Sequence, residues 1–231
     1  MYTLKTWRDP YDCGFNVCSR KEITFEEGLT VLVGCNGYGK TTTLHNLREQ
    51  LRKENIPWFE FDNQKDGRRN SMDKALYHGN FELLSGFMSS SEGESISLSL
   101  SSIATEMGKF IRTGKNKQNP FASIFGDEEE KEIPNKRFIL FDAVDSGYSI
   151  DNVIELKELF EIIIDDARKK GLELYIIISC NEYELANGEN CMDIGNGKYI
   201  QFKDYEDYKK FIMKTRDKKN KRYAKMNERS E

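Results

Sequence analysis

The segment 34–41 constrains this chain more than any other, because it reads Gly-Cys-Asn-Gly-Tyr-Gly-Lys-Thr. It fits the pattern G-x-x-x-x-G-K-[ST], in which a glycine-rich turn leads from a buried strand into a helix. An apolar, β-branched run at 29–33 precedes the segment, and a helical pattern at 41–53 follows it. The sequence therefore predicts a strand, an anion-binding loop and a helix, in that order.

The chemistry of this loop points to a nucleotide. Glycines let the backbone fold around an anion so that several N–H groups point at a phosphate, and the following helix N-terminus adds partial positive charge. Lys40 is expected to reach the β- and γ-phosphates, and the Thr41 hydroxyl to bind Mg²⁺. The predicted nucleotide-binding residues of the loop are Asn36, Gly37, Tyr38, Gly39, Lys40, Thr41 and Thr42.

Strand and helix patterns alternate along the chain, which predicts an α/β fold with a largely parallel central sheet flanked by helices, plus antiparallel strands near the N-terminus. Strands are expected at 3–7, 15–25, 29–33, 57–61, 138–141, 172–179 and, at a sheet edge, 199–202. Helices are expected at 41–53, 71–88, 96–111 (entered through Ser90 and Ser91), 150–167 and from Tyr205 onward, with a long loop at 114–136. We assign 1–208 to a nucleotide-binding domain, whose part 65–136 is helical, and 209–231 to a basic C-terminal helix or tail.

Composition narrows the class of protein. Of 231 residues, 38% are hydrophobic and 32% charged, which is too apolar for a disordered chain and too polar for a membrane protein. The first residues lack the apolar core of a signal peptide. Five cysteines without a C-x-x-C pair, and two histidines, favour reduced thiols over a zinc site or disulfides. We therefore expect a cytoplasmic protein with no membrane partner.

Charge is distributed unevenly. The segment 209–231 carries ten Lys or Arg and three acidic residues, a balance of +7, which leaves −11 on the first 208 residues of a chain whose net charge is −4. Such a tail could neutralise the phosphates of DNA. It could equally be a solvated helix end.

The version of the loop at 36–42, Asn-Gly-Tyr-Gly-Lys-Thr-Thr, resembles the N-G-x-G-K-[ST]-[ST] loop of ABC-type ATPases, including the chromosome-maintenance (SMC) and RecF-like repair branch. This resemblance implies ATP and Mg²⁺ as ligands and covers the chain to about residue 202. It also implies further motifs in a fixed order.

The first two implied motifs follow the loop. Gln64, after the strand at 57–61, stands where the family has a magnesium-contacting glutamine. The segment 90–94, Ser-Ser-Glu-Gly-Glu, resembles the family's signature, so Ser91, Gly93 and Glu94 would cover the γ-phosphate bound by a second protomer. The resemblance therefore implies an ATP-dependent homodimer. A serine-rich helix cap with nothing bound is the alternative.

In the remaining motifs, the residue at the family's binding position is retained, whereas the residues at its catalytic positions differ. Asp142, at the end of an apolar strand, would complete the metal set with Thr41 and Gln64. Ala143 follows where the family has its catalytic glutamate, and Asn181 stands where it has a histidine. Loss of a general base costs about 10² to 10⁴ in rate. We therefore expect slow hydrolysis through Lys40 and Asp142, with Asp145, Glu182 or Asn181 as substitutes.

Several kinds of ATPase remain open. Ser90 lies only 26 positions after Gln64, which argues against a transporter subunit and leaves no room for the coiled coil of an SMC protein. A P-loop kinase of a nucleoside or small metabolite would explain the loop and Asp142 but not the segment 90–94. A regulatory nucleotide-binding module for a protein partner is a further alternative. We favour a compact ABC-type ATPase that dimerises with ATP and acts as a switch in DNA repair or recombination.

Overall fold

The computed structural model describes residues 1–6, 18–62, 92–114, 134–143 and 148–230. Its strands are β1 (Tyr2–Lys5), β2 (Glu22–Phe25), β3 (Gly28–Val33), β4 (Trp58–Asp62), β5 (Lys136–Asp142), β6 (Glu173–Ser179), β7 (Cys191–Asp193) and β8 (Lys198–Ile200). Its helices are α1 (Lys40–Lys53), α5 (Glu92–Thr113), α7 (Ile150–Lys169), α8 (Tyr183–Ala186) and α9 (Tyr205–Ser230). The predicted α/β class is confirmed.

Six strands form the central sheet in the order β4-β5-β6-β3-β7-β8. The first five run parallel, and β8 pairs antiparallel with β7 at the edge. The middle strands β3, β5 and β6 are buried along nearly their whole length. This burial explains their continuous apolar sequences, because a parallel sheet is covered on both faces. The predicted parallel sheet and edge strand are therefore confirmed.

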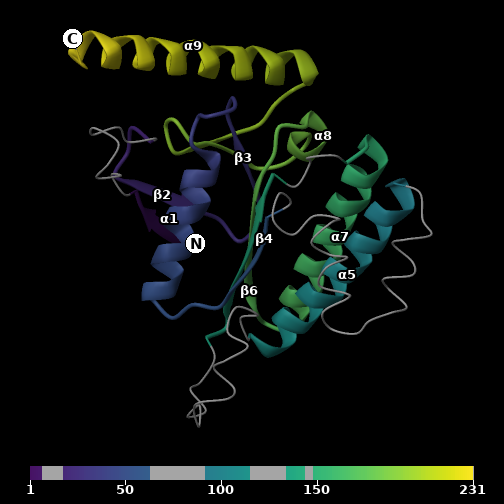
Figure 1. The fold of residues 1–231 in the computed structure, drawn as a ribbon. Coiled ribbons are helices and arrows are strands. Elements are labelled where there is room, and N and C mark those ends of the chain that lie inside the picture. Colours follow the sequence, from purple (N-terminus) through teal and green to yellow (C-terminus); the bar gives the residue numbers. More distant parts are fainter. Residues whose placement is uncertain (7–17, 63–91, 115–133, 144–147, 231) are drawn as a thin grey trace.

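Helices cover both faces of this sheet (Figure 1). Helices α5 and α7 pack on one face, where Met107 and Phe160 meet strand residues such as Phe141. Helix α1 covers the other face together with the separate two-stranded sheet of β1 and β2. This small sheet docks through Tyr2, whose ring meets the Phe138 ring edge-on at 4.8 Å between centres.

The structure differs from the predicted elements in a few places. The predicted strand at 15–25 is a strand only at Glu22–Phe25 within its described part, because the N–H of Ser19 donates to the Gly195 carbonyl (3.1 Å) instead of a strand partner. Helix α8 and strand β7, of four and three residues, were not predicted, since elements so short show no periodicity. The predicted helix at 71–88 and most of the loop at 114–136 lie outside the described residues.

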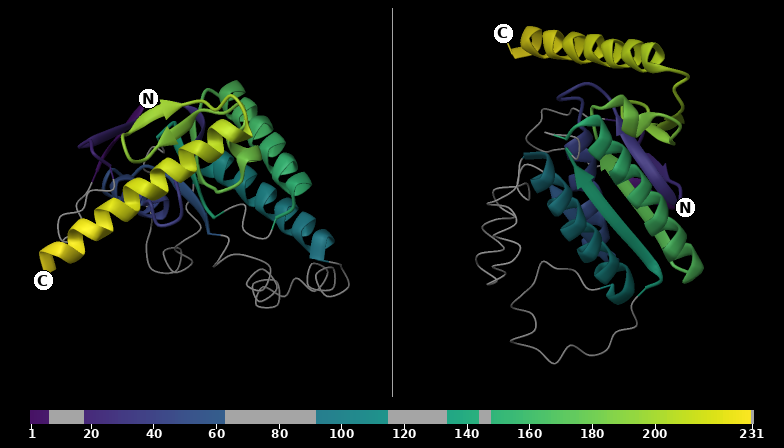
Figure 2. Two further views of the ribbon diagram at one scale, coloured as in Figure 1. Left: turned by 90° about the horizontal axis from the view of Figure 1, so that it is seen from above. Right: turned by 90° about the vertical axis from the view of Figure 1, so that its right-hand side faces the viewer.

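Helix α9 begins at Tyr205 as predicted and continues without a break past residue 208, where the sequence suggested a division. It crosses the body at the end of the sheet near the start of α1 (Figures 1 and 2). Tyr208 and Thr215 on this helix are buried against the body. In the described part of the chain, no helix is both long and apolar enough to cross a membrane.

The contact between α7 and the sheet generates a stability prediction. Phe160 is fully buried and its ring lies 5.1 Å from that of Phe141. Phe160→Ala should lower the free energy of unfolding by about 3–5 kcal/mol, through lost burial and the cavity that remains. Ile162→Ala, on the same helix but 66% exposed, should change it by less than about 0.5 kcal/mol. Urea denaturation measures both, and equal effects would contradict this packing.

Candidate phosphate-binding site

The order of the parallel strands brings the predicted site residues to one edge of the sheet. Strand β3 lies beside β6, and β6 lies beside β5. The loop 34–39 follows β3, Asn181 follows β6, and Asp142 ends β5. Because the carboxyl ends of parallel strands meet at one edge, residues far apart in sequence come together there.

The loop itself has the backbone that its glycines predict. Gly37 and Gly39 have φ angles of 71° and 106°, in the left-handed region that favours glycine. The N–H of Tyr38 donates to the carbonyl oxygen of Cys35 at 3.0 Å, which closes the turn. Gly39 stands at the N-cap of α1, whose first turn contains no acidic residue. The first turn of the helix therefore adds no carboxylate of its own at the positive end of the helix dipole, which faces the loop.

Lys40 is the central cation of the site. Its side chain is 8% exposed, and its ammonium donates to the carbonyl oxygen of Gly34 at 2.7 Å and to Oδ1 of Asn181 at 3.0 Å. These two acceptors are neutral oxygens, and the two contacts orient the ammonium. The structure thus brings Asn181 to the lysine of the loop, as expected from its place after β6.

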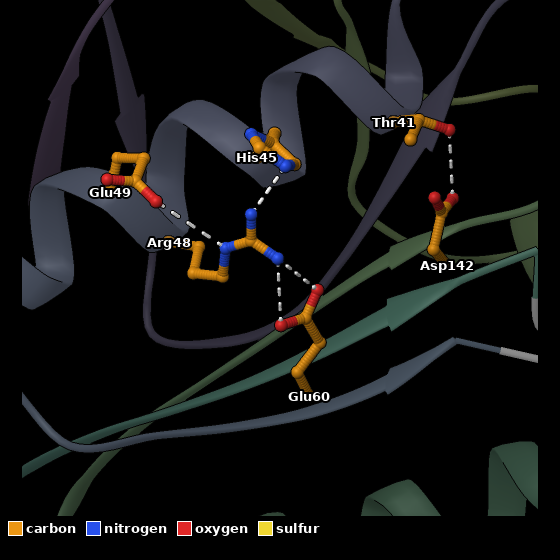
Figure 3. A network of polar contacts seen from close by, with 6 residues as sticks. All are labelled: Thr41, His45, Arg48, Glu49, Glu60 and Asp142. Atoms are coloured by element: carbon orange, nitrogen blue, oxygen red, sulfur yellow. Dashed lines mark hydrogen bonds and ion pairs between the residues drawn. The ribbon is translucent and has the colours of Figure 1, made fainter. Parts of the chain in front are cut away.

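A second group of oxygens lies beside the start of α1. The hydroxyl of Thr41 donates to Oδ1 of Asp142 at 3.2 Å (Figure 3), and the hydroxyl of Ser179 donates to the same carboxylate oxygen. Neighbouring ligands of Mg²⁺, at about 2.1 Å and right angles, lie about 3 Å apart. The Thr41 and Asp142 oxygens therefore fit two adjacent positions around one magnesium ion.

Ala143 has an unusual backbone. Its φ angle is 50°, which is uncommon for a residue with a side chain, and its N–H donates to the Ser179 hydroxyl at 3.1 Å. Ser179 is 3% exposed. Its hydroxyl contacts both the Asp142 carboxylate and the Ala143 N–H, and so connects these two neighbouring residues. A methyl group therefore stands directly after the carboxylate, where the resemblance implied a catalytic glutamate.

The ring of Tyr38 belongs to the core rather than to the open side of the loop. It is buried against Gly34 and Gly195, and among the described residues its hydroxyl has no hydrogen-bond partner. Burial raises the pKa of this tyrosine. A ligand of the loop would therefore contact Tyr38 through its backbone.

A polar network fixes α1 against the sheet (Figure 3). One guanidinium nitrogen of Arg48 lies 3.2 and 3.3 Å from the two carboxylate oxygens of Glu60 on β4. Arg48 also contacts Nε2 of His45 and the carboxylate of Glu49. These contacts help to set the position of the helix that carries Lys40 and Thr41.

The other predicted site residues fall in three groups. Asn36, Gly37 and Thr42 are exposed on the loop or at the start of α1. Glu182 is exposed before α8, and Gly93 and Glu94 lie in the first turn of α5. Outside the described residues lie Gln64, Ser91 and Asp145.

Sequence reasoning missed several residues that the structure places here. Ser179 is a buried polar residue at the end of an apolar strand, which is a signal that could have found it. Tyr208, Thr215 and Lys219 come from α9, and their contacts with the loop and with Asn181 join positions too distant in sequence to predict.

No known protein-family model and no curated protein matches this sequence. Within the described ranges, no group of three or more His, Cys, Asp or Glu side chains could hold a metal ion by themselves. A magnesium ion at Thr41 and Asp142 would therefore take its remaining ligands from phosphate, water or other residues.

The packing of Tyr38 under the loop can be tested. A methyl group on Gly195 would lie 2.2 Å from the Tyr38 hydroxyl, closer than any real contact. Gly195→Ala should therefore lower the free energy of unfolding by about 1–3 kcal/mol. Tyr38→Phe, which removes a buried hydroxyl, should be neutral or stabilising and should recover part of that loss in the double variant. Strictly additive effects in urea denaturation would show that the two residues do not meet.

Proposed function

We propose that this chain binds ATP with Mg²⁺ as a P-loop NTPase of the ABC type, hydrolyses it slowly, and uses the bound triphosphate as a switch. The observation that carries the proposal is the position of Lys40. Gly34 and Asn181 orient its buried ammonium, and Lys40 lies where the glycine loop ends and helix α1 begins. A cation, backbone N–H groups and a helix dipole at one point suit a polyphosphate.

Magnesium fits the same arrangement. The oxygens of Thr41 and Asp142 are 3.2 Å apart and stand next to the residue that would bind the phosphates. Magnesium is usually held by one or two protein oxygens together with phosphates and water. We propose Thr41 and Asp142 as its protein ligands, with Gln64 as a third.

We propose slow turnover because of two residues near Asp142 and Lys40, namely Ala143 and Asn181. Ala143 offers no carboxylate to accept a proton from water, and Asn181 carries no positive charge. Glu182 and Asp145 are the substitutes we propose if hydrolysis occurs. Binding would survive these changes because it depends on the loop, Lys40 and the metal.

The switch we propose is a homodimer. The segment 90–94 of one protomer, which leads into α5, would close on the γ-phosphate held by the other. A ligand shifts such an equilibrium only through contacts that differ between the open and closed states. DNA, bound through the basic part of α9, or a protein would be the partner of a cytoplasmic protein working in repair or recombination.

The proposed function makes a prediction about nucleotide affinity. Lys40→Ala should weaken MgATP binding about 100-fold, because it removes a charged donor to the phosphates. Lys53→Ala, an exposed lysine at the other end of the same helix, should leave the affinity unchanged. Isothermal titration calorimetry measures both. Equal affinity in the two variants would exclude Lys40 from the nucleotide site.

Asp142→Asn gives a matched test of the metal site in the same assay. It should weaken binding when Mg²⁺ is present and have little effect when EDTA removes the metal, because the carboxylate acts through the ion. Asp165→Asn, at an exposed position of α7, is the control. A loss of affinity that is the same with and without Mg²⁺ would contradict the metal assignment.

A further prediction concerns assembly. Light scattering should give twice the chain mass with MgATP, but not with ADP or without nucleotide, while little phosphate is released. Ser91→Arg should abolish dimerisation and leave nucleotide binding nearly intact. Ser101→Arg, at an exposed position of α5, should leave both dimerisation and nucleotide binding unchanged. Equal loss of binding and dimerisation would contradict the switch. Phosphate transfer to an added nucleoside would favour a kinase.

A further inference from the structure

Helix α9 lies against the phosphate-binding loop along one of its faces. Tyr208, Thr215, Lys219 and Arg222 recur at steps of seven, four and three, which places them on one side of a helix. Each contacts the site: the guanidinium of Arg222, for example, lies 5.9 Å from the centre of the Tyr38 ring. The helix therefore touches the loop at several successive residues.

Thr215 holds the first peptide unit of the loop. Its side chain is 1% exposed, its Oγ1 accepts the N–H of Cys35 at 3.0 Å, and its hydroxyl donates to the carbonyl of Ile212. The Cys35 N–H and the Gly34 carbonyl belong to one trans peptide unit, so they point in opposite directions. Turning the N–H toward α9 thus turns the Gly34 carbonyl toward the ammonium of Lys40, 2.7 Å away.

Lys219 holds a second peptide unit of the loop, but through the carbonyl oxygen of that unit rather than through its N–H. Its ammonium donates to the carbonyl oxygen of Asn36 at 2.8 Å. The Asn36 carbonyl shares its peptide unit with the N–H of Gly37, which must therefore point away from α9. An N–H turned to that side is available to an anion held within the loop.

Tyr208 completes the contact at the neighbouring strand end. Its hydroxyl donates to the backbone carbonyl of Asn181 at 2.7 Å, and the side chain of Asn181 accepts from Lys40. One helix therefore holds the backbone around both acceptors of the central ammonium. Contacts made only for packing would not need to fall on these peptide units.

We propose that Thr215 and Lys219 are positioning residues of the nucleotide site, and that α9 orients the loop for phosphate binding. The proposal rests on the proposed function, since it assigns the loop a nucleotide. Thr215 fixes the carbonyl that aligns Lys40, and Lys219 fixes the N–H of Gly37. Neither side chain needs to touch the nucleotide.

The test compares MgATP affinity in full-length variants by calorimetry. Thr215→Val keeps the shape of the side chain and removes its hydrogen bonds, so binding should weaken about tenfold. Thr215→Ser keeps the hydroxyl and should restore affinity to within about twofold. Lys219→Met should weaken binding about 3- to 10-fold. Lys218→Met and Lys221→Met remove the same charge at exposed positions of α9 and should leave affinity unchanged.

Amide hydrogen exchange without nucleotide gives an independent readout. In Thr215→Val the Cys35 amide should exchange faster while amides of the central strands keep their protection, which separates a local loop effect from general destabilisation. Affinities of Thr215→Val and Lys219→Met equal to that of Lys218→Met would overturn this inference alone. A wild-type chain that binds no MgATP would overturn the proposed function and this inference with it.

Discussion

The ammonium of Lys40 lies between the carbonyl oxygen of Gly34 and the side-chain oxygen of Asn181, at 2.7 and 3.0 Å. The rest of the site depends on this contact, and the contact depends on the parallel pairing of β3 with β6. Only that pairing ends both strands at the same edge. Helix α1 then starts where the loop closes, and β5, on the other side of β6, delivers Asp142 to Thr41. The chemistry of the edge is thus a consequence of strand order.

The glycine loop 34–39 is supported from two sides. Beneath it the Tyr38 ring fills the space against Gly34 and Gly195, and across it α9 contributes Thr215 and Lys219. The residues from 209 onward carry a balance of +7 on an otherwise acidic chain, and residues 209–230 belong to the helix that holds the loop. Because a backbone loop has many accessible conformations, contacts on both sides reduce the entropy that a ligand would have to remove.

Under the function that we propose, binding and hydrolysis are separable in this site. Thr41 and Asp142, the residues proposed for the metal, are in contact with each other, and Lys40, the residue proposed for the phosphates, contacts Gly34 and Asn181. Where a catalytic base would stand, Ala143 has a left-handed backbone held by Ser179. Strained backbone at such a position persists only when surrounding contacts maintain it. A protein of this design would hold a triphosphate for long periods, which suits a switch better than a motor.

The sequence by itself determined the local features: the glycine loop between a strand and a helix, the continuous apolar strands of a parallel sheet, and the start of α9 at Tyr205. These depend on residue types and short periodicities, so neighbouring residues suffice to predict them. It could not show that Thr215 would accept from Cys35, 180 residues away, or that the Tyr38 ring would turn into the core. Such contacts follow from how the sheet and the helices pack. The sequence contains many residues that could form a hydrogen bond with a hydroxyl or pack against an aromatic ring, and it does not distinguish among them. Only the tertiary structure decides which of them lies within reach.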